Sequence, residues 1–312
     1  MVSLTVLSAS KPPSFARGFP LTIEVTPEAT VADVKASIAA KFPKFSTSRQ
    51  RISVKDDKKP LEDETKLADV LGEQLRGGEL QVKDLGPQIS WRTVFLVEYA
   101  GPLLIHPLFY HLPQVFYGKE VQHSALQKYV YAFVMLHFIK RELETIFVHR
   151  FSHGTMPLLN IFKNSAHYHI FSGLFLALDV YRSKFSATSP YIVGTYRDNE
   201  KFLWVSAGIW AFAEISNLHT HLTLRNLRPA NTRKRAIPYG YGFSLVSCPN
   251  YFFEAVAWGV ICVMTGSVAA LVFTGLAVGQ MALWAIKKHK NYKKDFGKEY
   301  PRGRKAMFPF VL

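Results

Sequence analysis

Four residues near position 220 have types and spacings that suit the binding of a negatively charged group. Asn217, His221, Arg225 and Arg228 follow one another at intervals of four, four and three, so on a helix they lie on one face. Pro229 comes next, and a helix does not readily continue through proline. A basic segment of this kind more often touches lipid headgroups, but that contact needs no helical register. The helical register thus weakens the headgroup interpretation and keeps a phosphate site open, because arginine contacts phosphate with two hydrogen bonds.

A second group of polar residues lies at or within apolar segments, where polar groups are costly unless they are used. Asn250, Tyr251 and Glu254 stand at the entrance to a long apolar run, and Glu98 lies within an earlier one. An ionised carboxylate there costs about 2.5 to 3.5 kcal/mol, unless it reaches the headgroups or stays protonated. We favour a buried Glu98 that orients an active-site group. Tyr251 is its natural partner, because a phenol stays protonated at neutral pH and can donate.

These residues must be positioned by a chain of 312 residues that is 48% hydrophobic and carries a formal net charge of +15. That charge indicates an acidic partner: nucleic acid, an anionic lipid surface or a phosphate-bearing small molecule. Because the basic residues are interleaved with apolar runs, the last two are favoured and nucleic acid is not expected. Two cysteines without a CxxC pair predict neither a disulfide nor a zinc site. The histidines lack helical pairing with a carboxylate, so no metal is expected.

Residues 1–84 predict a small α+β domain. Apolar residues alternate as in strands, and a helix is expected from Val31 to Phe42, with Thr30 and Asp33 as a partial capping box. The order strand, strand, helix, strand, short turn, strand is that of a ubiquitin-like β-grasp. Residues 75–78 look like ubiquitin's conjugation tail, but a strand is expected after them, so we interpret them as a turn.

Residues 85–92 predict a polar linker, and residues 93–312 an α-helical polytopic membrane domain with six or seven spans. The last apolar run, 251–286, is too long for one crossing of about 20 residues, so a break is expected near 265–267. Earlier spans contain more Tyr, His and Asn than lipid contact tolerates, which indicates helices around a polar cavity. The basic tail, 287–305, predicts a cytosolic C-terminal tail on the same side as the N-terminal domain.

The pattern of these residues resembles the steroid 5-alpha reductase superfamily, and its very-long-chain trans-2-enoyl-CoA reductase branch in particular. The resemblance rests on Asn217, His219, Arg225 and Arg228 before Pro229, on Cys248-Pro249-Asn250-Tyr251 with Glu254, and on Arg304-Lys305-Ala306 before Pro309-Phe310. An N-terminal ubiquitin-like domain, the segment Gly86-Pro87-Gln88-Ile89-Ser90-Trp91-Arg92 and Glu98 are further points of similarity. The steroid branch usually has an acidic residue where this chain has His221.

That resemblance implies NADPH-dependent reduction of very-long-chain trans-2-enoyl-CoA, the last step of the fatty acid elongation cycle, in the endoplasmic reticulum membrane beside other elongation enzymes. It implies three sets of site residues: Tyr251 and Glu98 for catalysis; Asn217, His221, Arg225, Arg228, Asn250 and Glu254 for the cofactor; and Gln88, Lys140 and Arg141 for the substrate. Lys140 and Arg141 also suit a helix end at the membrane surface.

Two rival functions stay open. A reductase of the same superfamily that acts on a sterol or polyprenol enone would share the cofactor residues, although the steroid branch usually has Phe where this chain has Tyr251. A non-catalytic membrane adaptor that presents a ubiquitin-like domain is the other. Consumption of NADPH with an enoyl-CoA would exclude the adaptor.

Overall fold

The computed structural model describes residues 1–57, 59–151, 154–227 and 236–312. The chain forms two compact units, and the division between them falls after Trp91, within the predicted 85–92 linker. The first unit also includes a short segment around strand β6.

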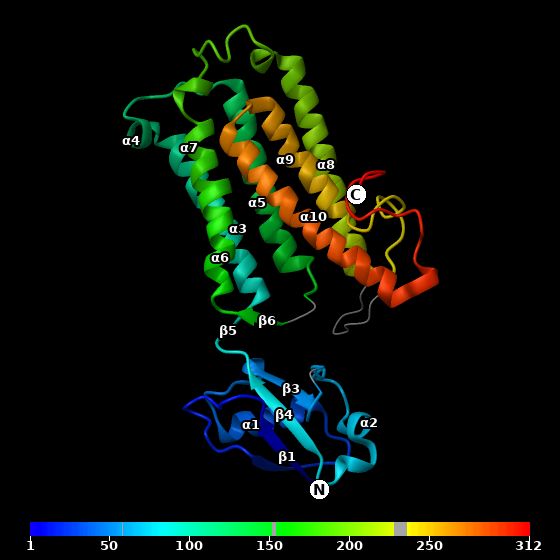
Figure 1. The fold of residues 1–312 in the computed structure, drawn as a ribbon. Coiled ribbons are helices and arrows are strands. Elements are labelled where there is room, and N and C mark those ends of the chain that lie inside the picture. The colour runs from blue at the N-terminus through cyan, green and yellow to red at the C-terminus, as the bar shows by residue number, and fades with distance from the viewer. Residues whose placement is uncertain (58, 152–153, 228–235) are drawn as a thin grey trace. The chain divides into compact units, whose positions relative to one another are not determined.

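The first unit is built on a mixed four-stranded sheet (Figure 1). Its strands are β1 (Val2–Ser8), β2 (Leu21–Val25), β3 (Gln50–Val54) and β4 (Glu79–Asp84), and their order is β2-β1-β4-β3. The two central strands, β1 and β4, are parallel, whereas the outer pairs are antiparallel. Because every second residue of β1 and β2 is buried, one face of each strand packs into the unit's core.

Helix α1 (Val31–Lys41) packs on that sheet through Val31, Val34 and Ile38. The predicted capping box is present: the Asp33 carboxylate accepts hydrogen bonds from the backbone N–H of Thr30 at 2.7 Å and from its hydroxyl at 2.9 Å. After β3 come the short helix α2 (Leu67–Leu71) and η2 (Gly72–Leu75). The predicted turn follows η2 at residues 76–77, where Gly77 has φ of +79°, and β4 begins at Glu79.

The predicted linker contains a strand that the sequence did not reveal. Strand β5 (Gln88–Ser90) pairs antiparallel with β6 (Thr155–Pro157). Three residues are too few for a recognisable alternation, and the partner strand lies far along the sequence.

The second unit is helical. Its longest helices are α3 (Trp91–His111), α5 (Ala125–Phe147), α8 (Glu200–Leu227), α9 (Pro249–Thr265) and α10 (Val268–Phe296). The shorter ones are α4 (Pro113–Tyr117), α6 (Asn160–Ala166) and α7 (Leu176–Val180), with the π-helix η3 (His167–Phe175) joining α6 to α7. Figure 1 shows the long helices side by side, and their buried apolar residues form one large core.

Helix η3 lies directly against α3. The ring of His169 covers Gly101, where an added Cβ would come within 2.0 Å of the imidazole, and its Nε2 hydrogen-bonds to the carbonyl of Val97 at 2.8 Å. Fully buried His106 contacts the hydroxyl of Tyr181 and the carbonyl of Ser172, both at 2.7 Å. The histidines of this region therefore join α3 to its neighbours.

The predicted break in the last apolar run lies where it was expected. Helix α9 ends at Thr265, Gly266 has φ of +60°, and the hydroxyl of Ser267 caps α10 by accepting from the N–H of Ala270. Among the described residues, two helices are long and apolar enough to span a membrane, Trp91–His111 and the stretch Val268–Glu299. The predicted total of six or seven spans is therefore not confirmed.

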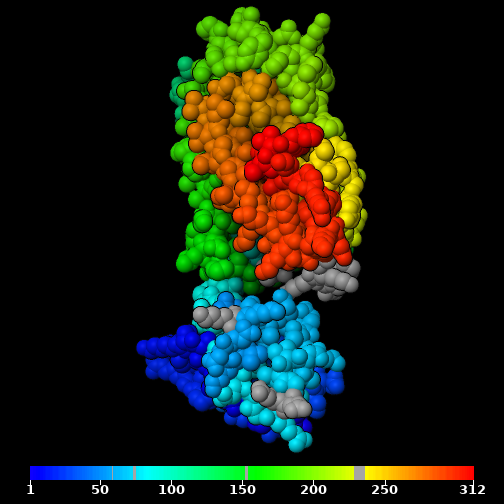
Figure 2. Space-filling model, turned by 45° about the vertical axis from the view of Figure 1, so that its right-hand side comes forward, coloured from blue at the N-terminus to red at the C-terminus, as the bar shows by residue number. Residues whose placement is uncertain are grey.

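The C-terminal segment lies on the start of α9 and on α10. Figure 2 shows this segment in red against α10 in orange and against the loop that precedes α9 in yellow. A parallel bridge joins Val246 to Lys305, and the N–H of Cys248 donates to the carbonyl of Ala306 at 3.0 Å. Met307 is buried in the same cluster as Met281 and Ala285 of α10.

Candidate active site

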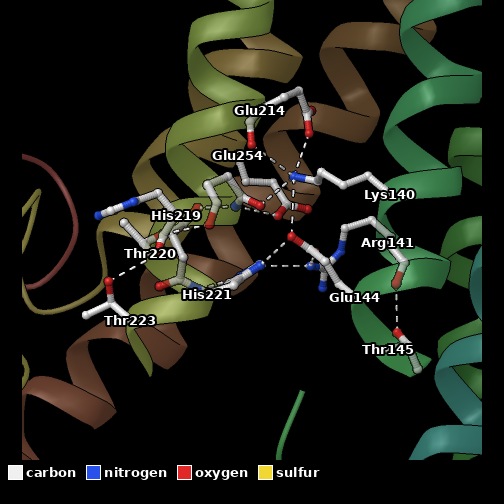
Figure 3. A network of polar contacts seen from close by, with 12 residues as sticks. Lys140, Arg141, Glu144, Thr145, Glu214, His219, Thr220, His221, Thr223 and Glu254 are labelled. Atoms are coloured by element: carbon white, nitrogen blue, oxygen red, sulfur yellow. Dashed lines mark hydrogen bonds and ion pairs between the residues drawn. The ribbon is translucent and has the colours of Figure 1, made fainter. Parts of the chain in front are cut away.

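A buried network of charged side chains lies where α5, α8 and α9 meet (Figure 3). The ammonium of Lys140 is 2.6 Å from a carboxylate oxygen of Glu214 and 2.6 Å from the amide oxygen of Asn217. His137 Nδ1 is 2.7 Å from the other carboxylate oxygen of Glu214. Residues 137, 140, 141 and 144 of α5, and 214, 217 and 221 of α8, recur at helical spacing, so each helix presents one polar face.

Glu144 connects this network to His221. Its carboxylate is ion-paired with the guanidinium of Arg141 and lies 3.0 Å from His221 Nδ1. Burial alone would raise the pKa of Glu144, but Arg141, His221 and Lys140 around it lower the pKa below its usual range. Burial lowers the pKa of His221.

Most of the predicted cofactor residues lie together. The side-chain amide of Asn217 donates to the carbonyl of Asn250 at 2.8 Å and to the carboxylate of Glu254 at 3.3 Å. Asn250 Nδ2 lies 3.4 Å from His221 Nε2. Arg225 is half-buried one turn farther along α8, and Arg228 lies outside the described residues.

Several buried polar atoms close to this network have no hydrogen-bond partner among the described residues. They include Nε of Arg141, Nδ1 of His149 and Oε1 of Glu98. Burial and the charge of Arg141 lower the pKa of His149 to about 2. An unpaired buried polar atom costs about 1 to 3 kcal/mol, so these atoms suit hydrogen bonds to a bound polar molecule.

The site also contains a group that spacing did not predict. One ligand atom each of Glu144, His149 and His221 lie within 4.8 Å of one another, a set that could hold a metal ion. However, Arg141 is ion-paired with Glu144 and its Nη1 lies 3.3 Å from His221 Nδ1. A divalent cation would therefore compete with a guanidinium, which disfavours a metal here.

The two predicted catalytic residues lie in different surroundings. Tyr251 faces α10, where the ammonium of Lys288 is 4.9 Å from its ring centroid and Trp284 is beside it. Glu98 is 1% exposed on α3. No contact joins Glu98 and Tyr251 among the described residues. The tyrosine that meets the network is Tyr99, whose hydroxyl accepts from Arg141 Nη2 at 3.0 Å.

The structure corrects one interpretation of Lys140 and Arg141. They do not mark a helix end, because α5 continues to Phe147. Arg141 is 9% exposed, and both cations are paired with carboxylates inside the bundle. Gln88 lies on β5 of the first unit, and its side-chain N–H donates to the carbonyl of Leu85 at 3.0 Å.

Sequence reasoning missed Glu144 and Glu214 because it examined polar residues at the ends of apolar runs. Helical spacing could have identified both. Glu144 lies four residues after Lys140 and seven after His137 on α5, and Glu214 lies three residues before Asn217 on α8.

Comparisons with known proteins identify relatives along most of the chain. Residues 154–312 match the model of the 3-oxo-5-alpha-steroid 4-dehydrogenase family. The chain is 40% identical over 288 residues to the very-long-chain enoyl-CoA reductase of Dictyostelium discoideum, covering 91% of this chain and 92% of the relative. It is 41% identical over 303 residues to a probable very-long-chain enoyl-CoA reductase of Caenorhabditis elegans, covering 94% of each. A trans-2,3-enoyl-CoA reductase-like protein of Homo sapiens is 33% identical over 301 residues, covering 93% of this chain and 79% of the relative.

Proposed function

This chain belongs to the enoyl-CoA reductases of the 3-oxo-5-alpha-steroid 4-dehydrogenase family, and from that membership we propose that it reduces very-long-chain trans-2-enoyl-CoA with NADPH. It is an enzyme that reduces a carbon–carbon double bond, which implies a nicotinamide cofactor and an acyl-CoA substrate. The observation that carries the proposal is the meeting of Asn217, His221, Asn250 and Glu254 from two helices.

The polar stripe of α8 suits a dinucleotide whose two ends differ in charge. Beside the buried end of this stripe, the charges of Lys140 and Arg141 on α5 are compensated by the carboxylates of Glu214 and Glu144. This end therefore offers hydrogen-bonding groups without a net charge. Those groups suit a nicotinamide amide and a ribose. Arg225, half-buried at the other end, suits a phosphate. We expect Arg228 to extend that cationic end.

The cofactor supplies hydride when it is bound. Reduction places that hydride on the β-carbon and a proton on the α-carbon, while negative charge develops on the thioester oxygen. The protein must therefore offer a proton donor near the α-carbon or that oxygen. We assign this role to Tyr251. Lys288, whose ammonium lies 4.9 Å from the ring centroid, would stabilise the phenolate left after donation.

We also propose that the enzyme is embedded in the endoplasmic reticulum membrane, with its N-terminal unit and basic tail cytosolic. The candidate spans and the many exposed apolar side chains of the second unit support this proposal; Leu104, Val205 and Leu283 are each more than 60% exposed. The strand order of the first unit supports a ubiquitin-like fold. Very-long-chain substrates imply use in fatty acid elongation, beside other enzymes of that cycle.

The test is oxidation of NADPH by purified protein with enoyl-CoAs of graded chain length. We expect NADPH to be preferred over NADH and long acyl chains over short ones. Turnover of a sterol or polyprenol enone, with none of an enoyl-CoA, would replace the substrate assignment. Lack of turnover with all three substrate classes in a folded preparation would favour the adaptor.

A further inference from the structure

An apolar groove lies along the second unit, between α10 and the continuous helix formed by η3 and α7. Its volume is about 600 Å³, and its lining includes Phe171, Phe175 and Leu178 on one side and Val268 and Val272 on the other. This volume is in the usual range for a ligand site, about 300 to 1,000 Å³. We propose that the groove holds the distal part of the substrate's acyl chain, an inference that rests on the proposed function.

A series of aromatic side chains leads from the polar network to this groove. Tyr99, which accepts from Arg141, packs edge-on against Tyr168 of η3 at 5.2 Å between ring centroids. His167 follows at 5.1 Å from Tyr168, then Phe171 at 6.1 Å and Phe175 at 5.8 Å. The same helix therefore borders the candidate active site at one end and the groove at the other.

The path from the network to the groove requires a long hydrocarbon chain. Tyr168 and Phe175 are seven residues apart on η3, and the ring of Tyr99 lies between Tyr168 and Arg141 of the network. An acyl group held at the network must therefore extend past Tyr99 and Tyr168 to reach Phe175, and only long chains can fill the groove.

The charges in the groove select hydrocarbon over a lipid headgroup. Its charged lining residues are Asp179 and Arg182, which are ion-paired at 2.7 Å. Asp179 also accepts from the hydroxyl of Ser267 at 2.5 Å. Because this pair is already compensated, it offers little to an anionic headgroup. The remaining lining is apolar, apart from the hydroxyl of Tyr117, which donates to the carbonyl of Ala177 at 3.0 Å. The end of an acyl chain needs no polar partner and fits this setting.

The first test fills the groove. Val272→Trp should lower kcat/KM roughly 10- to 200-fold for an enoyl-CoA of about 20 carbons, the range for misfit in an apolar pocket, and leave one of about six carbons unchanged. Leu271→Trp is the matched control, because Leu271 is the neighbouring exposed residue of α10 and does not line the groove. Equal effects on both substrates, or no effect on the long one, would overturn the proposal.

The second test reads binding without turnover. A saturated acyl-CoA of about 20 carbons with a photoreactive group at its methyl end should label the peptides around Phe175 and Val272, and excess unlabelled acyl-CoA should prevent this. Labelling elsewhere, or labelling that acyl-CoA does not displace, would show that bilayer lipid fills the groove and would end the proposal. Displaceable labelling here in a protein that reduces no enoyl-CoA would keep the groove as an acyl site and reject the proposed reaction.

Discussion

Tyr99 and Tyr251 each lie beside a cation, and the two pairs differ in the solvent exposure of their side chains rather than in distance. The guanidinium of Arg141 is 5.2 Å from the ring centroid of Tyr99, and the ammonium of Lys288 is 4.9 Å from that of Tyr251. Tyr99 is 3% exposed and packed among aromatic rings, whereas Tyr251 is half-buried beside an exposed lysine.

This comparison indicates that electrostatic surroundings alone do not identify a proton donor. Both cations would stabilise a phenolate, but a donor must also reach the reacting carbon. The hydroxyl of Tyr99 can reach that carbon only if the aromatic side chains packed around it move apart. We therefore assign a positioning role to the pair of Tyr99 and Arg141, and catalysis to the pair of Tyr251 and Lys288.

The largest effect should come from Tyr251→Phe. This change deletes the hydroxyl and keeps the ring, so turnover should fall about 10²- to 10⁴-fold with little change in NADPH affinity. Tyr99→Phe should lower turnover only a few-fold. Steady-state kinetics with titration of NADPH measures both. A reversed order, with Tyr99→Phe as the more damaging change, would transfer the donor role to the buried pair.

Arg141→Ala should have its main effect on stability. It would leave Glu144, which is 1% exposed, without its guanidinium partner, and breaking a buried pair in this way costs about 3 to 5 kcal/mol. Thermal unfolding in detergent measures the loss. Lys128→Ala, at an exposed position of α5, is the control and should be nearly neutral. An Arg141→Ala protein as stable as the control would mean that Arg141 is held for ligand binding.

Arg225→Gln should weaken NADPH binding by about 10- to 150-fold, because a charge-assisted hydrogen bond is worth about 1.5 to 3 kcal/mol. If Arg225 contacts the 2′-phosphate, the affinity for NADH should stay unchanged. Equal losses for both cofactors would place the arginine at the pyrophosphate instead. Lys201→Gln, at the far end of α8, serves as the control and should alter neither dissociation constant.

Removal of residues 1–84, the larger part of the first unit, should have the smallest effect. The core of residues 1–84 is its own apolar cluster, and no proposed catalytic or cofactor residue lies there. A chain that begins at Leu85 keeps strand β5 and its pairing with β6, so its turnover should stay within a few-fold of the full chain. A folded but inactive truncated protein would show that residues 1–84 take part in substrate binding or complete the active site.

Sequence reasoning succeeded where the information is local. The capping box at Thr30, the break at Gly266 and the shared face of Asn217 and His221 each depend on a few neighbouring residues. It did not foresee which residues of different helices would meet. Asn250 and Glu254 share a face of α9, but Tyr251 is rotated by about 100° from Asn250 and so faces α10. Neither the strand pairing of β5 nor the pairing of Arg141 with Tyr99 could be foreseen, because each depends on packing between distant segments.

The bridge between Val246 and Lys305 has a consequence for the order of biosynthesis. Residues 245–248 hold the start of α9, which carries Asn250 and Glu254, and they are hydrogen-bonded to residues 305 and 306. During translation those two residues emerge after every helix that surrounds the network. The amino end of α9 can therefore be anchored only once the ribosome has finished this segment, and a nascent chain stalled before residue 305 should hold its helices without a completed cofactor site.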